Sequence, residues 1–274
     1  MKIATIARDI SHSPNMAAND AAILECVAHE LCTREFEVIE ANDIKQTDGC
    51  MAVCHMSRSR EILQGLKSSE RRGIVVINRP AAVENCSRLK MMQILEKAGI
   101  PQPPFSIIDE HTPLDILRYP AWLKRAEGWS VHKGDVCFVR SAGEAREALD
   151  GMHSRDIAIA IHCEHITGDI VKFYGVGRQF FHYSYPDPEK SKFGLEKING
   201  TPHRYPFCLE KMKETIFAAA EAIGIEIYGG DCIIREDGCI SIIDINDFPS
   251  FSAIRDEAAK KIAEHITNKI NEKR

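Results

Sequence analysis

A pair of apolar strands around Asp237-Gly238 constrains this chain more than any other feature. An Asp-Gly pair between apolar segments is a strong signal for a two-residue β-hairpin turn. A turn of that length pairs Glu236 with Cys239, and the same register places Asp231 directly opposite Asp244. The sequence therefore predicts a hairpin in which two carboxylates face each other from otherwise apolar strands.

Two opposed carboxylates predict a bound cation. Residues directly opposite each other on neighbouring strands have Cβ atoms about 4.5–5.5 Å apart, where like charges repel. Asn246 lies two residues after Asp244 and shares its face, because side chains alternate along a strand. Oxygen ligands of this kind suit Mg²⁺, which phosphates and water normally complete. We predict a magnesium site at Asp231, Asp244 and Asn246; the alternative is a polar hairpin face without a ligand.

The overall composition restricts the partners. The net charge of −5 argues against nucleic acid or an anionic membrane as the main partner. No apolar run approaches the roughly 20 residues that span a bilayer, and the first residues are typical of a strand rather than a secretory signal. Ten scattered cysteines without a Cys-x-x-Cys pair favour free thiols in the cytoplasm. The sequence does not predict an oligomeric state.

The pattern of strands and helices predicts an α/β protein with several lobes. Residues 1–82 alternate strands with helices, which is typical of a small lobe built on a parallel sheet. Residues 83–274 are predicted as a second unit, with a small α+β lobe at about 106–175 and a C-terminal lobe at about 176–274. The polar segment 186–207 is long for a connection in a compact domain, which favours a functional role.

The stretch Ile242-Ile-Asp-Ile-Asn-Asp-Phe-Pro-Ser-Phe251 resembles the terminal motif of the ATP-grasp superfamily. In that motif an acidic residue and an asparagine two positions later bind the metals that bridge ATP phosphates, which implies these roles for Asp244 and Asn246. An upstream aspartate on the neighbouring strand is the usual third ligand, and Asp231 matches it. The resemblance implies an ATP-grasp fold, preceded by the small parallel-sheet lobe, that binds ATP with two Mg²⁺ ions. Ser250 stands where the family often has glycine.

Two further segments resemble the cationic side of an ATP-grasp site. The strand Tyr119-Pro-Ala-Trp-Leu-Lys124 resembles the family strand whose lysine reaches the nucleotide phosphates. The segment from Ser87 to Pro101 resembles the helix that starts with a phosphate-contacting lysine and ends in Gly-Ile-Pro. Arg88 takes that position here and keeps the positive charge, with Lys90 as the second choice.

Residues 128–135 correspond to the family's glycine-rich lid over the phosphates, although they contain fewer glycines. Ser130 is predicted to contact ATP. His132 resembles the lid histidine that faces the substrate in inositol polyphosphate kinases, with an ordinary surface histidine as the alternative.

The run His162-Cys-Glu-His165 has the composition of a zinc site. In a strand, however, neighbouring side chains point to opposite faces, so four ligands cannot converge. In the ATP-grasp family the corresponding strand pairs with adenine and offers an acidic residue to the ribose. The resemblance implies these roles for Ile166 and Glu164.

The next predicted strand carries candidates for catalysis. Lys172 and Tyr174 share one face by alternation. Lys172 resembles the family cation that contacts the transferred group, and Tyr174 and Arg178 are predicted to face the substrate. Lys172 and Arg88 are the predicted catalytic residues.

The resemblance implies ATP-dependent activation of a small molecule, and three functions stay open. The first is ligation of a carboxylate to an amine through an acyl phosphate, the commonest chemistry of the superfamily. The second is a small-molecule kinase of the inositol polyphosphate kinase type. The third is a nucleotide-binding regulator without catalysis. Each of the two enzymes would stabilise in-line phosphoryl transfer mainly by charge.

Overall fold

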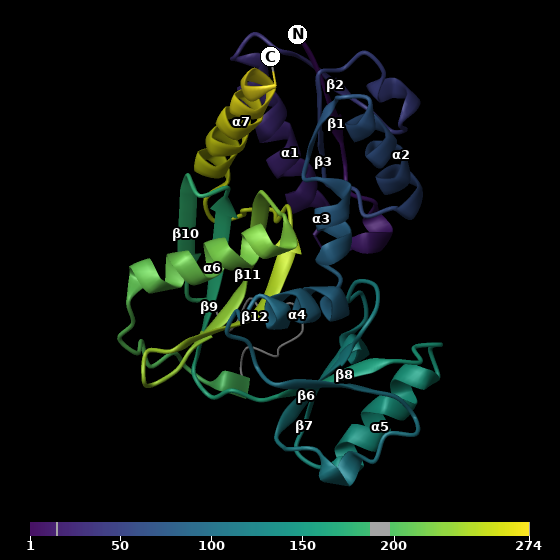
Figure 1. The fold of residues 1–274 in the computed structure, drawn as a ribbon, viewed down its shortest axis with the longest axis vertical. Coiled ribbons are helices and arrows are strands. Elements are labelled where there is room, and N and C mark those ends of the chain that lie inside the picture. Colours follow the sequence, from purple (N-terminus) through teal and green to yellow (C-terminus); the bar gives the residue numbers. More distant parts are fainter. Residues whose placement is uncertain (15, 187–197, 274) are drawn as a thin grey trace.

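The computed structural model describes residues 1–14, 16–186 and 198–273, and within these ranges it contains three four-stranded sheets. Figure 1 shows one sheet in each of three lobes, with both chain termini at the far end of the N-terminal lobe. Short 3₁₀ turns in the described ranges include Ile10–His12, Lys45–Thr47, Leu114–Ile116 and Lys133–Asp135. Among the described helices, none combines the length and the apolar character needed to cross a membrane.

The N-terminal lobe is a parallel sheet with the strand order β2-β1-β3-β4, as the alternation of strands and helices predicted. Its strands and main helices are β1 (Lys2–Ile6), α1 (Ala17–Cys32), β2 (Glu37–Glu40), β3 (Ala52–His55), α2 (Arg60–Arg71) and β4 (Val75–Ile77). Two helices, α3 (Pro80–Asn85) and α4 (Arg88–Lys97), then lead to the other lobes.

The small lobe is an antiparallel sheet with the order β5-β8-β6-β7 and one covering helix. It contains β5 (Phe105–Ile108), β6 (Ala121–Arg125), β7 (Val136–Val139), α5 (Ala142–His153) and β8 (Ala160–Glu164). Apolar side chains of α5 and of one sheet face, among them Leu149 and Leu123, form a separate core.

The C-terminal lobe is an antiparallel sheet with the order β10-β9-β11-β12. It contains β9 (Asp169–Val176), β10 (Phe180–Ser184), α6 (Leu209–Ile223), β11 (Ile227–Ile234), β12 (Ile240–Asp247) and α7 (Arg255–Glu272). Strand β9 was predicted to belong to the small lobe, which was expected to end near residue 175. It belongs to the C-terminal sheet instead, because it pairs with β11 along its whole length.

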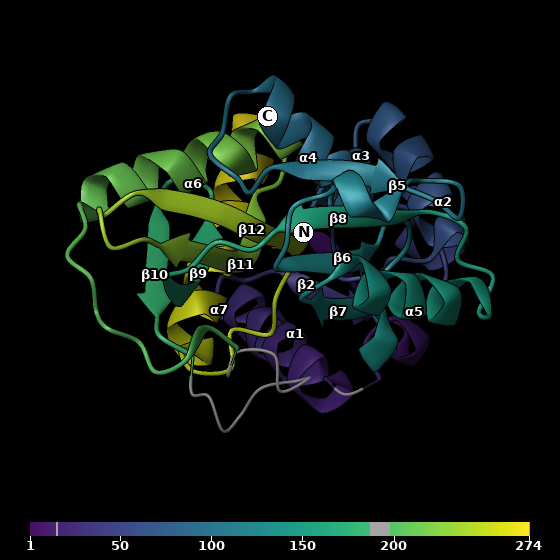
Figure 2. The ribbon, with the colours of Figure 1, turned by 90° about the horizontal axis from the view of Figure 1, so that it is seen from below.

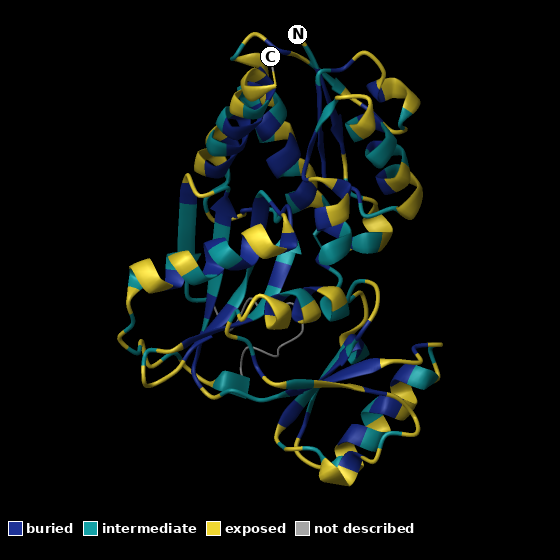
Figure 3. Cartoon of the chain, in the orientation of Figure 1, coloured by how far each residue is buried: buried dark blue, intermediate teal, exposed yellow. Residues whose placement is uncertain are grey.

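Helices cover this sheet from two sides (Figure 2). Helix α6 packs on one face, where Phe173, Met212 and Ile216 are buried in a common core. Helix α7 packs on the other side against α1, which joins the C-terminal and N-terminal lobes through a second core. Figure 3 shows the result as dark buried stripes on the inner sides of α1 and α7. All ten cysteines lie in the described ranges and are unpaired.

The β11–β12 hairpin forms, but its turn is longer than predicted. The N–H of Arg235 donates to the carbonyl of Cys239 at 2.9 Å, so the loop consists of residues 236–238. The predicted pairing of Glu236 with Cys239 is therefore wrong. Gly238 has a left-handed backbone (φ +75°), which permits this three-residue loop.

A second irregularity, a shift in the register of β11 and β12, restores the predicted partner of Asp231. The register shifts by one residue between Asp231 and Cys232, and beyond that shift Asp231 pairs with Asp244. The predicted pairing of the two carboxylates is thus confirmed, although through two compensating irregularities rather than through a regular ladder.

Candidate functional site

Three charged side chains lie side by side across β9, β11 and β12. Lys172 pairs with Asp231, and Asp231 pairs with Asp244. The Nζ atom of Lys172 donates to Oδ1 of Asp231 at 3.0 Å. We call Lys172, Asp231 and Asp244 the charged row. Both members of the Lys172–Asp231 pair are only partly exposed, 34% and 25%, so the row is partly shielded but open to a ligand.

Asn246 extends the row by one position along β12. Its Nδ2 donates to Oδ2 of Asp244 at 3.0 Å, so the amide and the carboxylate lie on one face, as alternation predicted. Within residues 1–14, 16–186 and 198–273, no three His, Cys, Asp or Glu side chains form a metal-binding group. Two carboxylates and an amide nevertheless suit Mg²⁺, because that ion takes oxygen ligands and usually keeps several waters and phosphate oxygens.

Glycines allow the strands around the charged row to pack closely. A Cβ atom on Gly230 would lie 2.2 Å from the carbonyl oxygen of Asp244 and 2.5 Å from the ring of Phe173. No side chain fits there, so glycine at position 230 fixes the distance between β11 and β12 beside the row. This requirement explains one of the two glycines that precede Asp231.

Tyr174 lies two residues from Lys172 on the same face of β9. Its ring centroid lies 5.4 Å from that of Phe251, in the core that joins the sheet to α7. Burial raises the pKa of the Tyr174 hydroxyl, Lys172 lowers it, and Asp231 raises it. The structure therefore brings Tyr174 next to the charged row.

Arg88 and Ser130 are in direct contact. The guanidinium of Arg88 donates to Oγ of Ser130 at 3.1 Å and to the carbonyl of Arg125 at 3.0 Å. The neighbouring backbone N–H of Leu89 donates to the carbonyl of Ala126 at 3.2 Å. The start of α4 is thus fixed to the end of β6 and to the lid, residues 128–135.

Lys124, the second predicted phosphate-binding cation, lies in the small lobe. It is 9% exposed and sits on β6, on the face that carries Trp122, whereas its neighbour Leu123 points into the core under α5. Burial raises the pKa of the Cys163 thiol on the adjacent strand, while Lys124 and Arg88 both lower it. Both predicted phosphate-binding cations are thus within electrostatic reach of the same buried thiol.

A second buried thiol lies at the turn into α4. Cys86 lies two residues before Arg88 and is 4% exposed. Burial raises the pKa of its thiol well above the ordinary value; Asp247 adds to this effect, Arg58 opposes it, and Asp244 adds to it. The corner that leads into α4 is thus within electrostatic reach of Asp244.

The predicted adenine-binding segment follows β8. The side chain of Glu164 shares the face of Ala121, which belongs to the core under α5, and lies 3.9 Å from Arg118. It therefore points away from the face that carries Lys124. Ile166 begins the turn to β9, and its carbonyl accepts a long hydrogen bond of 3.5 Å from Asn199.

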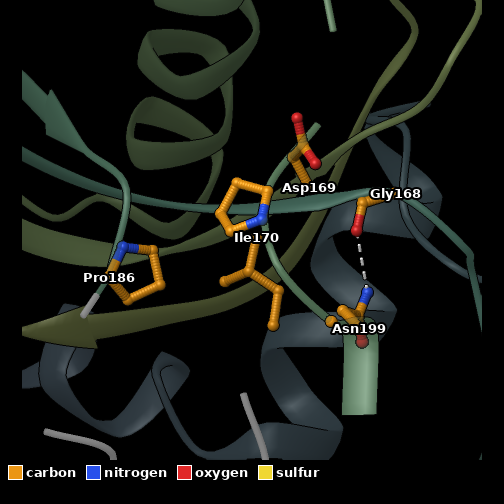
Figure 4. A pocket seen from close by; sticks show the side chains of 7 residues that line it. Gly168, Asp169, Ile170, Pro186 and Asn199 are labelled. Atoms are coloured by element: carbon orange, nitrogen blue, oxygen red, sulfur yellow. Dashed lines mark hydrogen bonds between the residues drawn. The ribbon is translucent and has the colours of Figure 1, made fainter. Parts of the chain in front are cut away.

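A small pocket borders this turn (Figure 4). Asn199 donates to the carbonyl of Gly168 at 3.0 Å. The carboxylate of Asp169 is 2% exposed and accepts the backbone N–H groups of His203 at 2.7 Å and Tyr205 at 3.0 Å. The chain segment before α6 is thereby anchored on the predicted adenine-binding turn. Residues 187–197 of the predicted functional loop 186–207 lie outside the described residues.

The lid is held by its own hydrogen bonds. Oδ2 of Asp135 accepts the N–H groups of Val131 and His132, and Oδ1 pairs with Arg155 at the end of α5. Burial raises the pKa of Asp135, but Arg155 and those two N–H groups outweigh it and hold the pKa below its ordinary value. The ring of His132 accepts the N–H of Gly134 at 3.0 Å, so this predicted substrate residue also serves as a helix cap.

The structure does not place Arg178 at the charged row. Its guanidinium pairs with Glu214 and with Glu221 on α6 and stacks over the ring of Phe217. Helix α6 covers the sheet face opposite the charged row, so Arg178 lies on the wrong side of the sheet for a contact with Lys172.

Two arginines of the N-terminal lobe lie at the site although the sequence motifs did not predict them. Arg58 donates from Nε to Oδ1 of Asp247 at 2.8 Å, and Nη2 of Arg8 lies 3.5 Å from Oδ2 of the same carboxylate. Burial raises the pKa of Asp247, but Arg58 and Arg8 outweigh it and hold the pKa below its ordinary value. A signal was present, because Arg8 and Arg58 closely follow the apolar strands β1 and β3. The carboxyl ends of parallel strands meet at one edge of a sheet, where ligands commonly bind.

Comparison with solved structures supports the fold, whereas comparison with family models and curated proteins gives no match. Among solved structures, the ATP complex of D-alanine–D-alanine ligase from Bacillus anthracis is similar with a TM-score of 0.74, at 14% identity over the whole of both chains.

Two further structures give the same result. A second structure of the Bacillus anthracis ligase has a TM-score of 0.71 at 13% identity, again over the whole of both chains. A RimK domain ATP-grasp protein from Sphaerobacter thermophilus has a TM-score of 0.70 at 16% identity, over 97% of this chain and the whole of the other. Together with the order of the three sheets, these likenesses show that the chain has the ATP-grasp fold, as its terminal motif predicted.

Proposed function

We propose that the protein binds ATP with Mg²⁺ between the small and C-terminal lobes and uses it to join a carboxylate substrate to an amine. The observation that carries this proposal is the charged row. Asp231 and Asp244 face each other, with Asn246 on one side and Lys172 on the other. Two carboxylates this close favour a cation between them.

The roles of the side chains follow from their positions. Arg88 and Lys124, which both act electrostatically on Cys163, would bind the nucleotide phosphates, with Ser130 as a further donor. Asp231, Asp244 and Asn246 would hold Mg²⁺. When bound, this ion neutralises phosphate charge during phosphoryl transfer. The backbone at Ile166 remains the candidate for the adenine edge, because the N–H of Glu164 already donates to the carbonyl of Pro104.

Lys172 is placed to act on the group that is transferred. Its ammonium lies on Asp231, within the charged row, and remains partly exposed. A cation at this place would stabilise negative charge on the transferred phosphoryl group as it moves to the substrate carboxylate. An amine would then attack the acyl phosphate and release phosphate.

Ligation is favoured over the other chemistries by the structural neighbours. Two of these structures are of one D-alanine–D-alanine ligase, and the third is a RimK domain ATP-grasp protein. The lid histidine that pointed to an inositol polyphosphate kinase caps its own turn through Gly134. The unpaired cysteines are compatible with a reducing compartment such as the cytoplasm.

The test is product analysis with Mg-ATP and pools of amino acids and small carboxylic acids. A ligase releases ADP and free phosphate in equal amounts, and hydroxylamine traps its acyl phosphate as a hydroxamate. A kinase releases ADP without matching free phosphate. If no pool supports turnover although Mg-ATP raises the melting temperature, the ligase proposal is replaced by a nucleotide-binding regulator.

A further inference from the structure

Arg58 and Arg8 fix the end of β12 from the N-terminal lobe. Arg58 binds Oδ1 of Asp247 through two nitrogen atoms, Nε at 2.8 Å and Nη2 at 2.6 Å. Arg8 donates to the carbonyl oxygens of Asp247 at 3.1 Å and of Phe248 at 2.8 Å. The three charged side chains are nearly inaccessible: Arg8 is 4%, Arg58 9% and Asp247 1% exposed. They therefore act on the strand and are closed to solvent.

Asp247 directly follows Asn246, one of the candidate magnesium ligands. A carboxylate anchored by two buried arginines, together with a backbone held through two carbonyls, leaves little freedom at residues 246–248. Charge-assisted hydrogen bonds of this kind are roughly twice as strong as neutral ones. The position of Asn246 thus depends on side chains from a different lobe.

The same Arg58 also contacts the lid. Its Cζ atom lies over the ring of Trp129, 3.9 Å from the ring centroid, at cation–π distance. The edge of the guanidinium remains engaged with Asp247. Trp129 directly precedes Ser130, which binds Arg88. One guanidinium therefore contacts both the lid and the end of β12.

We propose that Arg58 is a positioning residue that couples the lid to the magnesium-binding end of β12. The inference rests on the proposed function, because it assumes that Mg-ATP binds at the charged row. A lid closed over the nucleotide stacks Trp129 on Arg58, and the guanidinium then holds Asp247 and Asn246 in the arrangement that binds the metal. Loss of either contact weakens the same coupling.

A double-mutant cycle tests the coupling by calorimetric binding of Mg-ATP. Trp129→Leu removes the ring, and Arg58→Lys keeps the charge but loses the stacked, two-nitrogen geometry. From the strength of cation–π and charge-assisted contacts, we expect the dissociation constant to rise about three-fold for Trp129→Leu and about ten-fold for Arg58→Lys. The double variant should also bind about ten-fold more weakly, because the second substitution removes nothing further. Arg60→Lys, an exposed change two residues away, should bind like the wild type.

Fluorescence gives a second readout. The chain has two tryptophans, so Trp122→Phe leaves Trp129 as the only reporter. Its emission should change when Mg-ATP is added, and Arg58→Lys in the same background should remove most of that change.

The outcomes separate the two proposals. A wild type that binds no Mg-ATP would overturn the proposed function and this inference together. A wild type that binds, with a double variant about thirty-fold weaker because the two effects multiply, would overturn the coupling and leave the proposed function intact. An unchanged Trp129 signal in Arg58→Lys would also overturn it.

Discussion

The ammonium of Lys172 lies 3.0 Å from the carboxylate of Asp231, in the same row as the carboxylate of Asp244. The lysine therefore offsets part of the repulsion between the two aspartates when no metal is bound. The positive charge of Lys172 thus has two roles: it stabilises the protein without a ligand, and it is proposed to act on the transferred phosphoryl group.

Lys172→Met should destabilise the protein without Mg²⁺, and the loss of stability should be smaller when Mg²⁺ is present. Without the ammonium, Asp231 and Asp244 repel, and we expect the free energy of unfolding to fall by about 1 kcal/mol. Millimolar Mg²⁺ should restore part of this loss, because the ion supplies the missing positive charge. Urea denaturation with and without Mg²⁺ measures the difference.

The control for this prediction is Lys213→Met. Lys213 pairs with Glu210 on the surface of α6. Its loss should cost less and should not depend on Mg²⁺. An equal loss for Lys172→Met in both buffers would contradict the role assigned to the row.

Asp244→Asn should abolish magnesium-dependent turnover and leave the fold intact. The substitution keeps the size of the side chain but removes a metal-binding charge, so ATP turnover should fall about 10²–10³-fold. The free energy of unfolding without metal should stay equal or rise, because repulsion with Asp231 disappears. Asp237→Asn, in the turn of the same hairpin, should retain turnover. The metal site is misassigned if Asp244→Asn turns over ATP at the wild-type rate.

Arg88→Ala and Arg178→Ala should differ in their effect on ATP. Arg88 donates to Ser130 of the lid, whereas Arg178 pairs with α6 on the other side of the sheet. We expect KM for ATP to rise about ten-fold for Arg88→Ala, from the loss of one charge-assisted contact, and to stay unchanged for Arg178→Ala. Steady-state kinetics at saturating Mg²⁺ measures both; similar values would refute this placement of the cations.

Gly230→Ala should destabilise the protein, and Gly151→Ala should stabilise it. A Cβ on Gly230 would overlap the carbonyl oxygen of Asp244 at 2.2 Å, which we expect to cost about 3 kcal/mol. Gly151 lies inside α5 with nothing within 4 Å of an added Cβ, so alanine should gain about 0.5–1 kcal/mol. Chemical denaturation compares the two. A Gly230→Ala variant as stable as the wild type would show that β11 and β12 can separate.

Glu226→Gln should reduce stability at neutral pH but not in acid. The carboxylate lies 2.7 Å from His265 and 3.0 Å from Lys269 of α7. Burial raises its pKa, but the two partners outweigh this and hold the pKa below the ordinary value of 4.5. Its stabilising effect is thus complete above pH 4.5 and is lost as the pH falls through the lowered pKa. Melting temperatures of the wild type and the variant should differ at pH 7 and converge near pH 3. A difference in melting temperature that is the same at both pH values would show that the contacts of Glu226 with His265 and Lys269 do not cause it.

The sequence predicted the fold where local signals and the family motif agreed. The Asp237-Gly238 turn and the terminal motif placed Asp231 against Asp244, and the alternation in residues 1–82 predicted the parallel sheet. Strand β9 was assigned to the wrong lobe, because its alternating pattern shows that it is half-buried but not which sheet it joins. Only the pairing with β11 decides that question.

Local sequence patterns did not predict the contacts between the lobes. Arg8, Arg58 and Asp247 are far apart in the sequence, and nothing near any of them indicates a buried charged partner. Likewise, Arg178 follows β9 closely enough to suggest the cleft, but the glutamates on α6 attract it to the opposite side.

The three-residue turn and the shift at Asp231 compensate each other, and this has a consequence for natural variation of the hairpin. If the strands paired as in a two-residue turn, Glu236 with Cys239, while the shift remained, Ile245 rather than Asp244 would lie opposite Asp231. Length changes in this hairpin should therefore be tolerated only in matched combinations. In relatives of this protein, the turn and the shift should be gained or lost together.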